Sequence, residues 1–447
     1  MLRRALYRTF RSLSRIDYRV RRRFTRGGGL ALGALSAAAV VGLDTNQTVA
    51  YQAFTFLLAV LVLALAAGFG FRLRFGARRV LPRFATAGQP ITYRVVIENR
   101  TRRWRRGLVL LEEVPDPRPS LEEFLLADDD DDAADNWWDR RVGYARWQVL
   151  LTRNRAAEVA EHPLPPLPAG GVADVRVELL PLRRGLLSFA GLTVARPDPF
   201  GLVRGLRRIA VPDSLLVLPR RYPVPPIRLA GTRKFQQGGV ALASSVGDSE
   251  EFAALRDYRP GDPRRRIHWR SWARVGRPVV REHQDEFFAR HALVLDTFAG
   301  AGQGERFEAA VSVAASLACA LDTGESLLDL LFVGPRAYSL TVGRGLAHVD
   351  QMLEVLAGVQ VCRDEPFAAL HRLVLARADA LSGCLAVLLG WDGARQAFVR
   401  DLAGRGIPTL ALLVTGRGER LPALGEAPGV RLHPVWLDRI AEDLAVL

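Results

Sequence analysis

The residue types that could do chemistry are concentrated in one stretch, residues 247–281, which is rich in charge and aromatic rings. It contains acids, arginines, two tryptophans and His268, but no nucleophile–base pair and no metal-ligand spacing. We expect its side chains to form a salt-bridged element that docks two domains or a partner. A catalytic or nucleotide site that uses His268 or His283 is the alternative. The expected docking residues are Glu251, Asp257, Tyr258, Asp262, Arg264, Trp269, Trp272 and Arg274.

Local signals in this stretch predict a helix, a turn and a strand. Asp248 as the N-cap, with Glu251 three residues later, is typical of a helix start. The helix must end before Pro260, because the residue before a proline is disfavoured in the α region. Alternation over residues 267–272 predicts a strand, with the two tryptophans on opposite faces.

Two further acids each follow an apolar run that reads as a buried strand: Asp296 and Asp392. In an open parallel sheet, ligands bind beyond the carboxyl ends of the strands, where such acids would lie. Mg²⁺ requires near-octahedral oxygen coordination, so two carboxylates alone would hold it only weakly. We therefore expect no resident cofactor. A weak, incomplete Mg²⁺ site at this pair is the alternative to a role as turn and cap residues.

The acids belong to a region in which strands and helices alternate. This alternation over residues 291–447 predicts a doubly wound, mainly parallel, Rossmann-type sheet covered on both faces. The predicted strands are residues 291–296, 327–333, 337–342, 384–389 and 407–414. The predicted helices are residues 305–321, 347–357, 367–376, 394–404 and 437–447.

From about residue 80 to residue 219 the apolar pattern has a period of two, which predicts a β-sandwich of the immunoglobulin-like kind. No segment of helical period interrupts it. The acidic run at residues 128–132, followed by Trp137 and Trp138, is expected to be an exposed insertion loop. The predicted strands are residues 91–97, 108–111, 145–151, 172–179 and 186–194.

The net charge of +15 is concentrated in two short flanks, so it does not favour nucleic-acid binding. Residues 1–26 hold ten arginines and one acid, and residues 72–83 hold five arginines and no acid. Between these flanks lie two uncharged stretches, residues 27–43 and 45–71. We expect a hairpin of two transmembrane helices whose arginines contact anionic lipids. The positive-inside rule then places both termini in the cytoplasm.

The apolar residues of segment 1–26 recur at three- and four-residue steps, which predicts a basic amphipathic helix in the membrane interface. A cleavable signal sequence is the alternative for this segment. The whole chain is therefore expected to be multidomain. Its parts are an interfacial segment (1–26), a membrane hairpin (27–71), a β-sandwich (72–220), a docking segment (221–290) and an α/β domain (291–447).

Enzyme signatures are missing from the sequence. It contains no Gly-x-Ser-x-Gly elbow and no Gly-x-x-x-x-Gly-Lys-Ser/Thr loop. We expect a non-enzymatic scaffold that recruits a partner. The alternative is a metal-dependent or His/Asp-based enzyme that uses residues 248–286 and the crevice at Asp296 and Asp392.

The stretch at residues 247–281 also resembles the signature of the domain of unknown function 58 family. The residues that carry this resemblance are Glu250, Glu251, Phe252, Leu255, Arg256, Tyr258, Pro260, Gly261, Asp262, Arg264, Ile267, Trp269, Ala273 and Arg274. His268 and Arg270 stand where that family usually has an acidic residue and a lysine. A second hallmark of the family is similar to residues 198–202, Asp-Pro-Phe-Gly-Leu.

The resemblance implies a membrane protein with a von Willebrand A-like domain and a MoxR-type AAA+ ATPase as partner. It would place Asp296 and Asp392 on the two strands that flank the reversal of strand order. Von Willebrand A domains end their first strand with Asp-x-Ser-x-Ser and use the hydroxyls for Mg²⁺. Here Phe298 and Gly300 replace both hydroxyls. The implied role is protein assembly or envelope maintenance.

Overall fold

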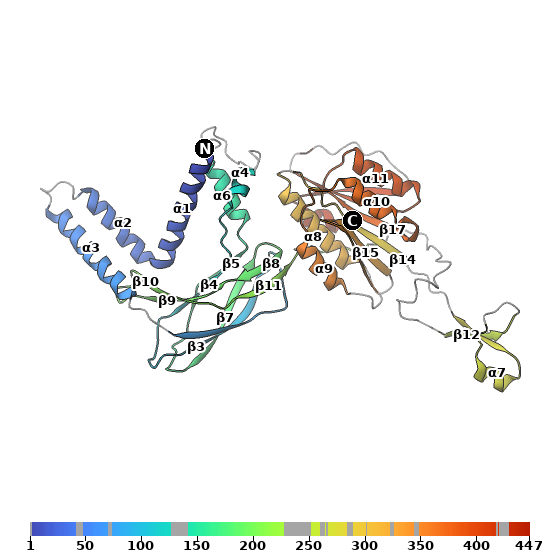
Figure 1. The fold of residues 1–447 in the computed structure, drawn as a ribbon, viewed down its shortest axis with the longest axis horizontal. Helices are drawn as coiled ribbons and strands as arrows, with labels where there is room; N and C mark the ends of the chain where they lie inside the picture. Colours follow the sequence, from blue (N-terminus) through green and yellow to red (C-terminus); the bar gives the residue numbers. More distant parts are fainter. Residues whose placement is uncertain are drawn as a thin grey trace. The chain divides into compact units, whose positions relative to one another are not determined.

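The computed structural model describes residues 2–41, 48–69, 74–126, 142–227, 252–259, 264, 267–283, 289–300, 302–321, 326–343, 348–416, 419 and 429–447. Within them the chain forms two units, each with its own hydrophobic core (Figure 1). The first is Met1–Arg221 with Gly300–Glu305 and Leu353–Val359; the second is Tyr222–Ala299, Arg306–Met352 and Gln360–Leu447. Both mix helices with sheets, so the prediction of a multidomain chain is confirmed.

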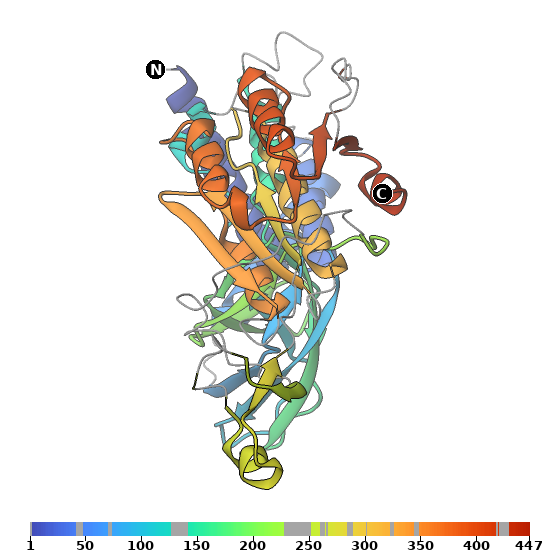
Figure 2. The ribbon, with the colours of Figure 1, turned by 90° about the vertical axis from the view of Figure 1, so that its right-hand side faces the viewer.

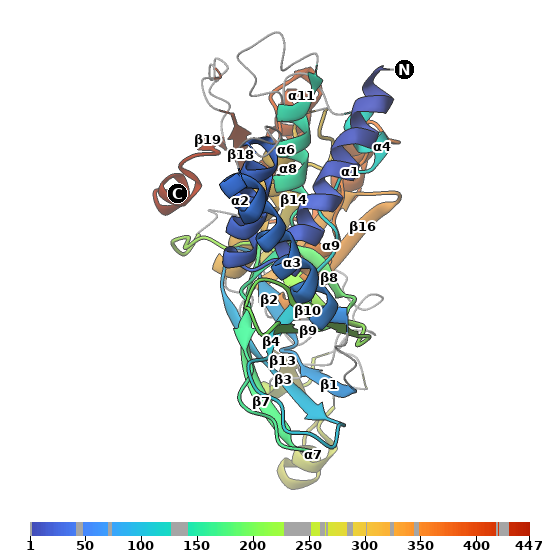
Figure 3. The same cartoon turned by 90° about the vertical axis from the view of Figure 1, so that its left-hand side faces the viewer.

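The first unit begins with three helices: α1 (Leu2–Arg23), α2 (Arg26–Val41) and α3 (Thr48–Phe69). The last two are apolar and lie side by side (Figures 1 and 3). α3 contains a window, Val49–Gly68, that is long and apolar enough to cross a membrane. α2 has 16 residues, or about 24 Å of helix against a hydrocarbon core of about 30 Å. Among the described helices only α3 meets the requirements for a span, and the second span stays a prediction.

Residues 75–218 form three small sheets around one core. Their strand orders are β1-β3-β7-β5, β10-β9-β4-β6 and β2-β11-β8. Side chains alternate between buried and exposed along the two longest strands, as expected for a sandwich. The strands are β1 (Phe75–Val80), β2 (Phe84–Thr86), β3 (Ile91–Asn99), β4 (Val109–Glu113), β5 (Ala157–Val159), β6 (His162–Pro163), β7 (Val172–Pro181), β8 (Gly185–Phe189), β9 (Gly191–Pro197), β10 (Arg204–Ile209) and β11 (Asp213–Leu218).

Two predictions for this unit were wrong. Residues 145–151 form a helix, α6 (Tyr144–Arg153), because Trp147 and Leu150 bury one helical face. A short helix, α4 (Leu121–Leu126), precedes it. The single strand predicted at residues 186–194 is two strands, β8 and β9. The two strands belong to different sheets, and at Gly191, the first residue of β9, an added Cβ would lie 2.4 Å from the carbonyl oxygen of Ile209.

Part of the apolar stripe of α1 packs against other helices of this unit. Tyr7 and Phe10 pack on Phe124 of α4 and Trp147 of α6, with ring centroids 5.8 to 6.4 Å apart. Further along the helix, Leu13 is 58% exposed. The predicted basic amphipathic helix is therefore present, but its N-terminal half packs on protein and only the later part of its stripe is open.

A buried ion pair links two sheets of the sandwich. Arg79 of β1 and Glu112 of β4 lie 2.8 Å apart with both side chains almost fully buried. Tyr93 donates to the other oxygen of Glu112 at 2.6 Å, and Arg79 donates to the carbonyl of Gly191 at 2.7 Å. Burial, and then the charge of Glu112, raise the pKa of Tyr93 far above its usual range. Removal of one partner of such a pair typically costs about 3–5 kcal/mol.

The β9–β10 hairpin attaches the sandwich to the turn between α1 and α2. Its tip is held by Asp198, which accepts the backbone N–H groups of Leu202 at 3.1 Å and Val203 at 2.9 Å. Thr25, between the two helices, donates its N–H to the carbonyl of Leu202 at 3.0 Å. Gly28 passes so close that an added Cβ would lie 1.9 Å from the same carbonyl oxygen. Residues 198–202, Asp-Pro-Phe-Gly-Leu, thus form a structural turn that contacts the chain where α1 ends and α2 begins.

The second unit is built on one six-stranded sheet with the order β16-β15-β14-β17-β18-β19 (Figures 1 and 2). All neighbouring strands are parallel except β15 and β16. On one side of β14 the chain continues to β15 and β16, and on the other side to β17, β18 and β19. The reversal of strand order therefore lies between β14 and β17. The strands are β14 (Ala289–Leu295), β15 (Ser326–Val333), β16 (Ala337–Val342), β17 (Gly383–Leu388), β18 (Thr409–Thr415) and β19 (Val430–Trp436).

Helices lie on both faces of this sheet, with α10 and α11 on the face opposite α8 (Figure 1). The five predicted strands and five predicted helices of residues 291–447 are confirmed within a few residues. Strand β19 was missed, since a charge, a histidine and a proline interrupt its apolar pattern. The helices are α8 (Gly304–Ala320), α9 (Val349–Gly358), α10 (Phe367–Leu375), α11 (Gly393–Gly404) and α12 (Ile440–Ala445), with a 3₁₀ turn at Ala378–Ala380.

The signature stretch has the opposite secondary structure to that predicted. Phe252–Asp257, predicted as helix, is strand β12, which pairs antiparallel with β13 (Val279–His283). Trp269–Val275, predicted largely as strand, is helix α7. Gly276, at φ 72°, ends the helix in the left-handed conformation, and its N–H bonds the carbonyl of Trp272. Pairing with a strand more than twenty residues away overrode the local signals.

Candidate functional site

The structure brings the two predicted acids together at the reversal of strand order. Asp296 directly follows β14, and Asp392 lies four residues beyond the end of β17, as the N-cap of α11. These strands are parallel neighbours, with Leu295 opposite Val387. Their carboxyl ends therefore meet at one edge of the sheet, where an open α/β sheet binds its ligands.

Asp296 is fully buried and both of its carboxylate oxygens are occupied. One oxygen accepts the N–H of Phe298 at 3.0 Å. The other accepts the N–H of Leu389 at 3.0 Å and the Nε–H of Arg395 at 2.6 Å. The carboxylate thus holds the loop after β14 against the loop after β17.

Arg395, on the first turn of α11, lies between the two acids. It bonds Asp296 through Nε and Asp392 through Nη1, the latter at 2.5 Å, and donates Nη2 to the carbonyl of Phe298 at 3.2 Å. Its guanidinium also lies 4.9 Å over the ring of Phe367. Asp392 in turn accepts the backbone N–H of Arg395 at 2.9 Å, as a helix N-cap should.

The electrostatics of this cluster keep Arg395 charged. Burial alone would lower the pKa of Arg395, but the hydrogen bond and charge of Asp296, together with those of Asp392, raise it overall. Side-chain exposure is 10% for Arg395, 0% for Asp296 and 56% for Asp392. The Asp296–Arg395 pair is therefore the structural part of the cluster, and Asp392 is its solvent-facing rim.

The donor set at this edge does not fit Mg²⁺. Both carboxylate oxygens of Asp296 already accept hydrogen bonds, from two backbone N–H groups and a guanidinium. Phe298 and Gly300 supply no side-chain oxygen. The hydroxyl of Thr297 is turned to the carbonyl of Val333. The guanidinium of Arg395 occupies the position between the carboxylates that a bridging cation would need. Among the described residues, no group of three potential metal ligands is found.

Sequence reasoning missed Arg395. The spacing of Asp392 and Arg395, three residues apart at a helix start, signals a local ion pair. Nothing in the sequence places Arg395 beside Asp296, which is 99 residues away.

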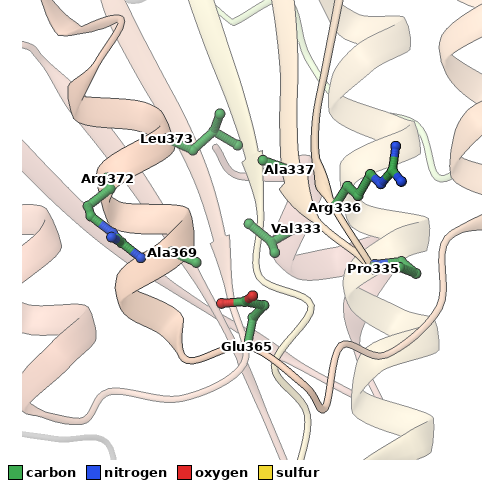
Figure 4. Close-up of a pocket in the computed structure, with 8 residues that line it drawn as sticks. All are labelled: Val333, Pro335, Arg336, Ala337, Glu365, Ala369, Arg372 and Leu373. Carbon is green, nitrogen blue, oxygen red and sulfur yellow. The ribbon is translucent and has the colours of Figure 1, made fainter.

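A shallow groove of about 390 Å³ lies beside the cluster, at the carboxyl end of β15 (Figure 4). Thr297 links the two, because its hydroxyl bonds Val333 in the groove wall. Arg336, Arg372 and Glu365 border an apolar lining of Val333, Pro335, Ala337, Ala369 and Leu373. Such a mixed, open surface suits contact with a peptide segment better than enclosure of a small substrate.

The signature stretch places its two tryptophans on one face, not on opposite faces. Trp269 and Trp272 are one helical turn apart in α7, and their rings stack with centroids 5.1 Å apart and an interplanar angle of 19°. Trp269 is 63% exposed, and the stacking of the two rings shows that the expectation of opposite faces was wrong. Neither of them is buried.

The other predicted docking residues belong to the same small module, which consists of β12, α7, β13 and the segments between them. Asp257 pairs with Arg277 at 3.0 Å with both side chains exposed, and the Tyr258 N–H bonds the carbonyl of Pro278. Arg264 and Arg274 are exposed. Glu251 and Asp262 lie outside the described residues, as do Asp248 and the acidic run at residues 128–132. Of the predicted salt-bridge network, the described part of the chain shows this exposed Asp257–Arg277 pair.

Of the two histidines considered for catalysis, His268 has no acid among its described hydrogen-bond partners. His268 precedes α7, and its Nδ1 lies 2.6 Å from the hydroxyl of Ser271, a local contact at the helix start. His283 ends β13.

Residues 254–382 match a protein family described as "Protein of unknown function DUF58". The match begins in β12 and ends just before β17, so it includes α7 and Asp296 but not Asp392 or Arg395. "Uncharacterized protein YeaD" of Bacillus subtilis (strain 168) is 24% identical over 217 residues, which make up 48% of this chain and 52% of that protein. The match thus spans about half the length of that relative.

Two solved structures show low similarity. The ASH / PapD-like domain of human CEP192 is 12% identical with a TM-score of 0.18, covering 33% of this chain and 86% of that one. A beta-glucosidase from Paenibacillus barengoltzii is 12% identical with a TM-score of 0.13, covering 38% of this chain and 18% of that one. At these TM-scores neither comparison bears on the fold.

The Asp296–Arg395 pair makes a direct prediction for stability. Arg395→Met leaves a buried carboxylate without its cation, so it should destabilise the α/β unit by about 3–5 kcal/mol. Arg400→Met is the matched control, because Arg400 lies on the same helix, α11, with an exposed side chain and should change stability by about 0.5 kcal/mol or less. Hydrogen exchange of β14 and β17 in urea, with the full chain in detergent, measures both. Equal losses in the two variants would contradict a special role for Arg395.

Magnesium should not stabilise the protein. Mg²⁺ at about 1,000 times the Kd of a site would raise the free energy of unfolding by about 4 kcal/mol. The Tm would rise markedly as a result. We expect the Tm of the full chain to be the same in millimolar Mg²⁺ and in EDTA. A rise that disappears in Asp296→Asn would show a metal site and refute this view of the cluster.

Proposed function

We propose that the chain is a membrane-associated interaction protein without catalytic activity, whose family-matched segment recruits a partner. The observation that carries this proposal is the stacked pair Trp269 and Trp272, of which Trp269 is exposed and Trp272 half-buried. Tryptophan and arginine are enriched at the centres of protein interfaces. Arg264, Arg270 and Arg274 lie on the same module with exposed side chains. No acid occurs from residue 264 to residue 281, so the module suits an acidic partner surface.

We propose a MoxR-type AAA+ ATPase as that partner, in protein assembly or envelope maintenance. The support is the resemblance of residues 250–274 to the domain of unknown function 58 signature. The strand order of the second unit, with an acid directly after β14 at the reversal, supports a von Willebrand A-like relationship. Because Arg395 already neutralises that acid, partner binding would not depend on a metal.

The partner proposal predicts a separation of binding from stability. Trp269→Ala removes an exposed ring, so it should weaken the partner complex at least about tenfold, or about 1.4 kcal/mol, without changing the Tm. Trp104→Ala is the control, because Trp104 is similarly exposed (59%) but lies in the sandwich. The measurement is co-purification of the ATPase with the detergent-solubilised full chain, with and without ATP. Equal recovery with both variants would overturn the assignment of α7.

We propose further that the chain is held in the inner membrane of a bacterium, with α2 and α3 as a hairpin and both termini in the cytoplasm. The support is the apolar window of α3 and the arginine-rich flanks at residues 1–26 and 72–83.

This topology is testable with fusions at the N-terminus, at residue 84 and at the C-terminus. All three should be active with a cytoplasmic reporter and inactive with a periplasmic one. If α3 were the only span, the N-terminal fusion would lie on the opposite side of the membrane from the other two.

A further inference from the structure

A further cluster of side chains that could bind a ligand lies in the sandwich of the first unit. Trp104, Arg105, Arg106 and Arg196 line a surface pocket of about 280 Å³. The lining therefore consists of three cations and one aromatic ring, with no acid. Arg106 lies 4.2 Å over the face of Trp104, which is 59% exposed.

The fold fixes this pocket from two sides. Arg105 exchanges backbone hydrogen bonds of 2.9 and 2.8 Å with Leu167, which anchors the segment before β4. β4 pairs with β9 so that Val109 lies opposite Ala195. Residues just before Val109 therefore lie beside Arg196. The cationic side chains meet because of strand register and not because of flexible loops.

Among the described residues, no ion pair joins an acid to Arg105, Arg106 or Arg196 of the pocket. Nε of Arg105 is buried without a hydrogen-bond partner. Burial, followed by the charges of Arg196 and Arg103, lowers the pKa of Arg105. The nearby acids are already engaged, because Glu161 pairs with Arg204 at 2.7 Å and Asp198 holds the hairpin tip. Like charges held together in this way are relieved by a bound anion.

The pocket is close to the end of the candidate membrane span. Arg196 pairs with Gly205 across the β9–β10 hairpin. A Cβ added to Gly68, the last residue of the apolar window, would lie 3.9 Å from the backbone nitrogen of Gly205. Arg196 is thus one strand away from the point where α3 would leave the hydrocarbon. Exposed tryptophan is typical of that depth in a membrane.

We propose that this pocket binds the phosphate group of an anionic lipid headgroup. Guanidinium groups bind phosphate oxygens in paired, charge-assisted hydrogen bonds, and three of them converge here. The ring of Trp104 would lie among the headgroups. The inference rests on the proposed membrane attachment. It adds a defined site to the general attraction between arginine-rich flanks and anionic lipid.

The test is isothermal titration calorimetry, which measures the Kd of each ligand for the detergent-solubilised full chain. The ligands are short-chain phosphatidylglycerol, short-chain phosphatidylcholine and inorganic phosphate. The pocket variant is Arg106→Gln with Arg196→Gln, both exposed side chains. The matched control is Arg176→Gln with Arg207→Gln, which removes the same charge from exposed strand positions. We expect phosphatidylglycerol to bind at least about tenfold more tightly than phosphatidylcholine, and this preference to be lost only in the pocket variant.

Equal loss in both variants would show non-specific charge attraction and overturn the site. Absence of a preference for phosphatidylglycerol would overturn it as well. Inorganic phosphate that binds as tightly as phosphatidylglycerol would show a soluble-anion site instead. Membrane attachment is measured separately, by resistance of the full chain to carbonate extraction. The pocket variant should stay in the membrane, so failure of the lipid site and failure of the anchor give different results.

Discussion

A carboxylate buried at the end of a parallel strand must have a cation, and in this protein the cation is supplied by the chain itself. Asp296 is fully buried, and an unpaired charge there would be expelled or protonated. The Nε atom of Arg395 lies 2.6 Å from a carboxylate oxygen of Asp296, and its Nη1 atom donates to Asp392. This single guanidinium therefore fixes the loops after β14 and β17 and the start of α11 in one arrangement. The edge of the sheet where ligands usually bind is rigid and charge-compensated.

The same constraint explains where binding surfaces remain. With its acids compensated, the described part of this edge has a shallow groove between Arg336 and Arg372. Two further surface features are the stacked tryptophans of α7 and the arginine-lined pocket of the sandwich. In both places an exposed tryptophan lies with exposed arginines, and these residue types are enriched at protein interfaces. The two would serve different partners, an acidic protein surface and a lipid headgroup.

Much of the α/β unit could be predicted because buried parallel strands are continuous apolar runs separated by amphipathic helices. The signature stretch could not. Its helix-start signal at Asp248 and its alternation at residues 267–272 are local, whereas β12 exists because it pairs with β13. Gly276 was a helix-end signal that went unused. Likewise the sequence identified Asp296 and Asp392 but not Arg395, because a contact between residues 99 apart leaves no local pattern.

The most direct test of the internal cation is a crystal structure of the protein soaked in Mn²⁺, which shares the preference of Mg²⁺ for oxygen ligands. Anomalous scattering would locate any bound ion without reference to activity. We predict guanidinium density between Asp296 and Asp392, with no anomalous peak at that position. A peak bound to Asp296, with the side chain of Arg395 displaced, would contradict the account.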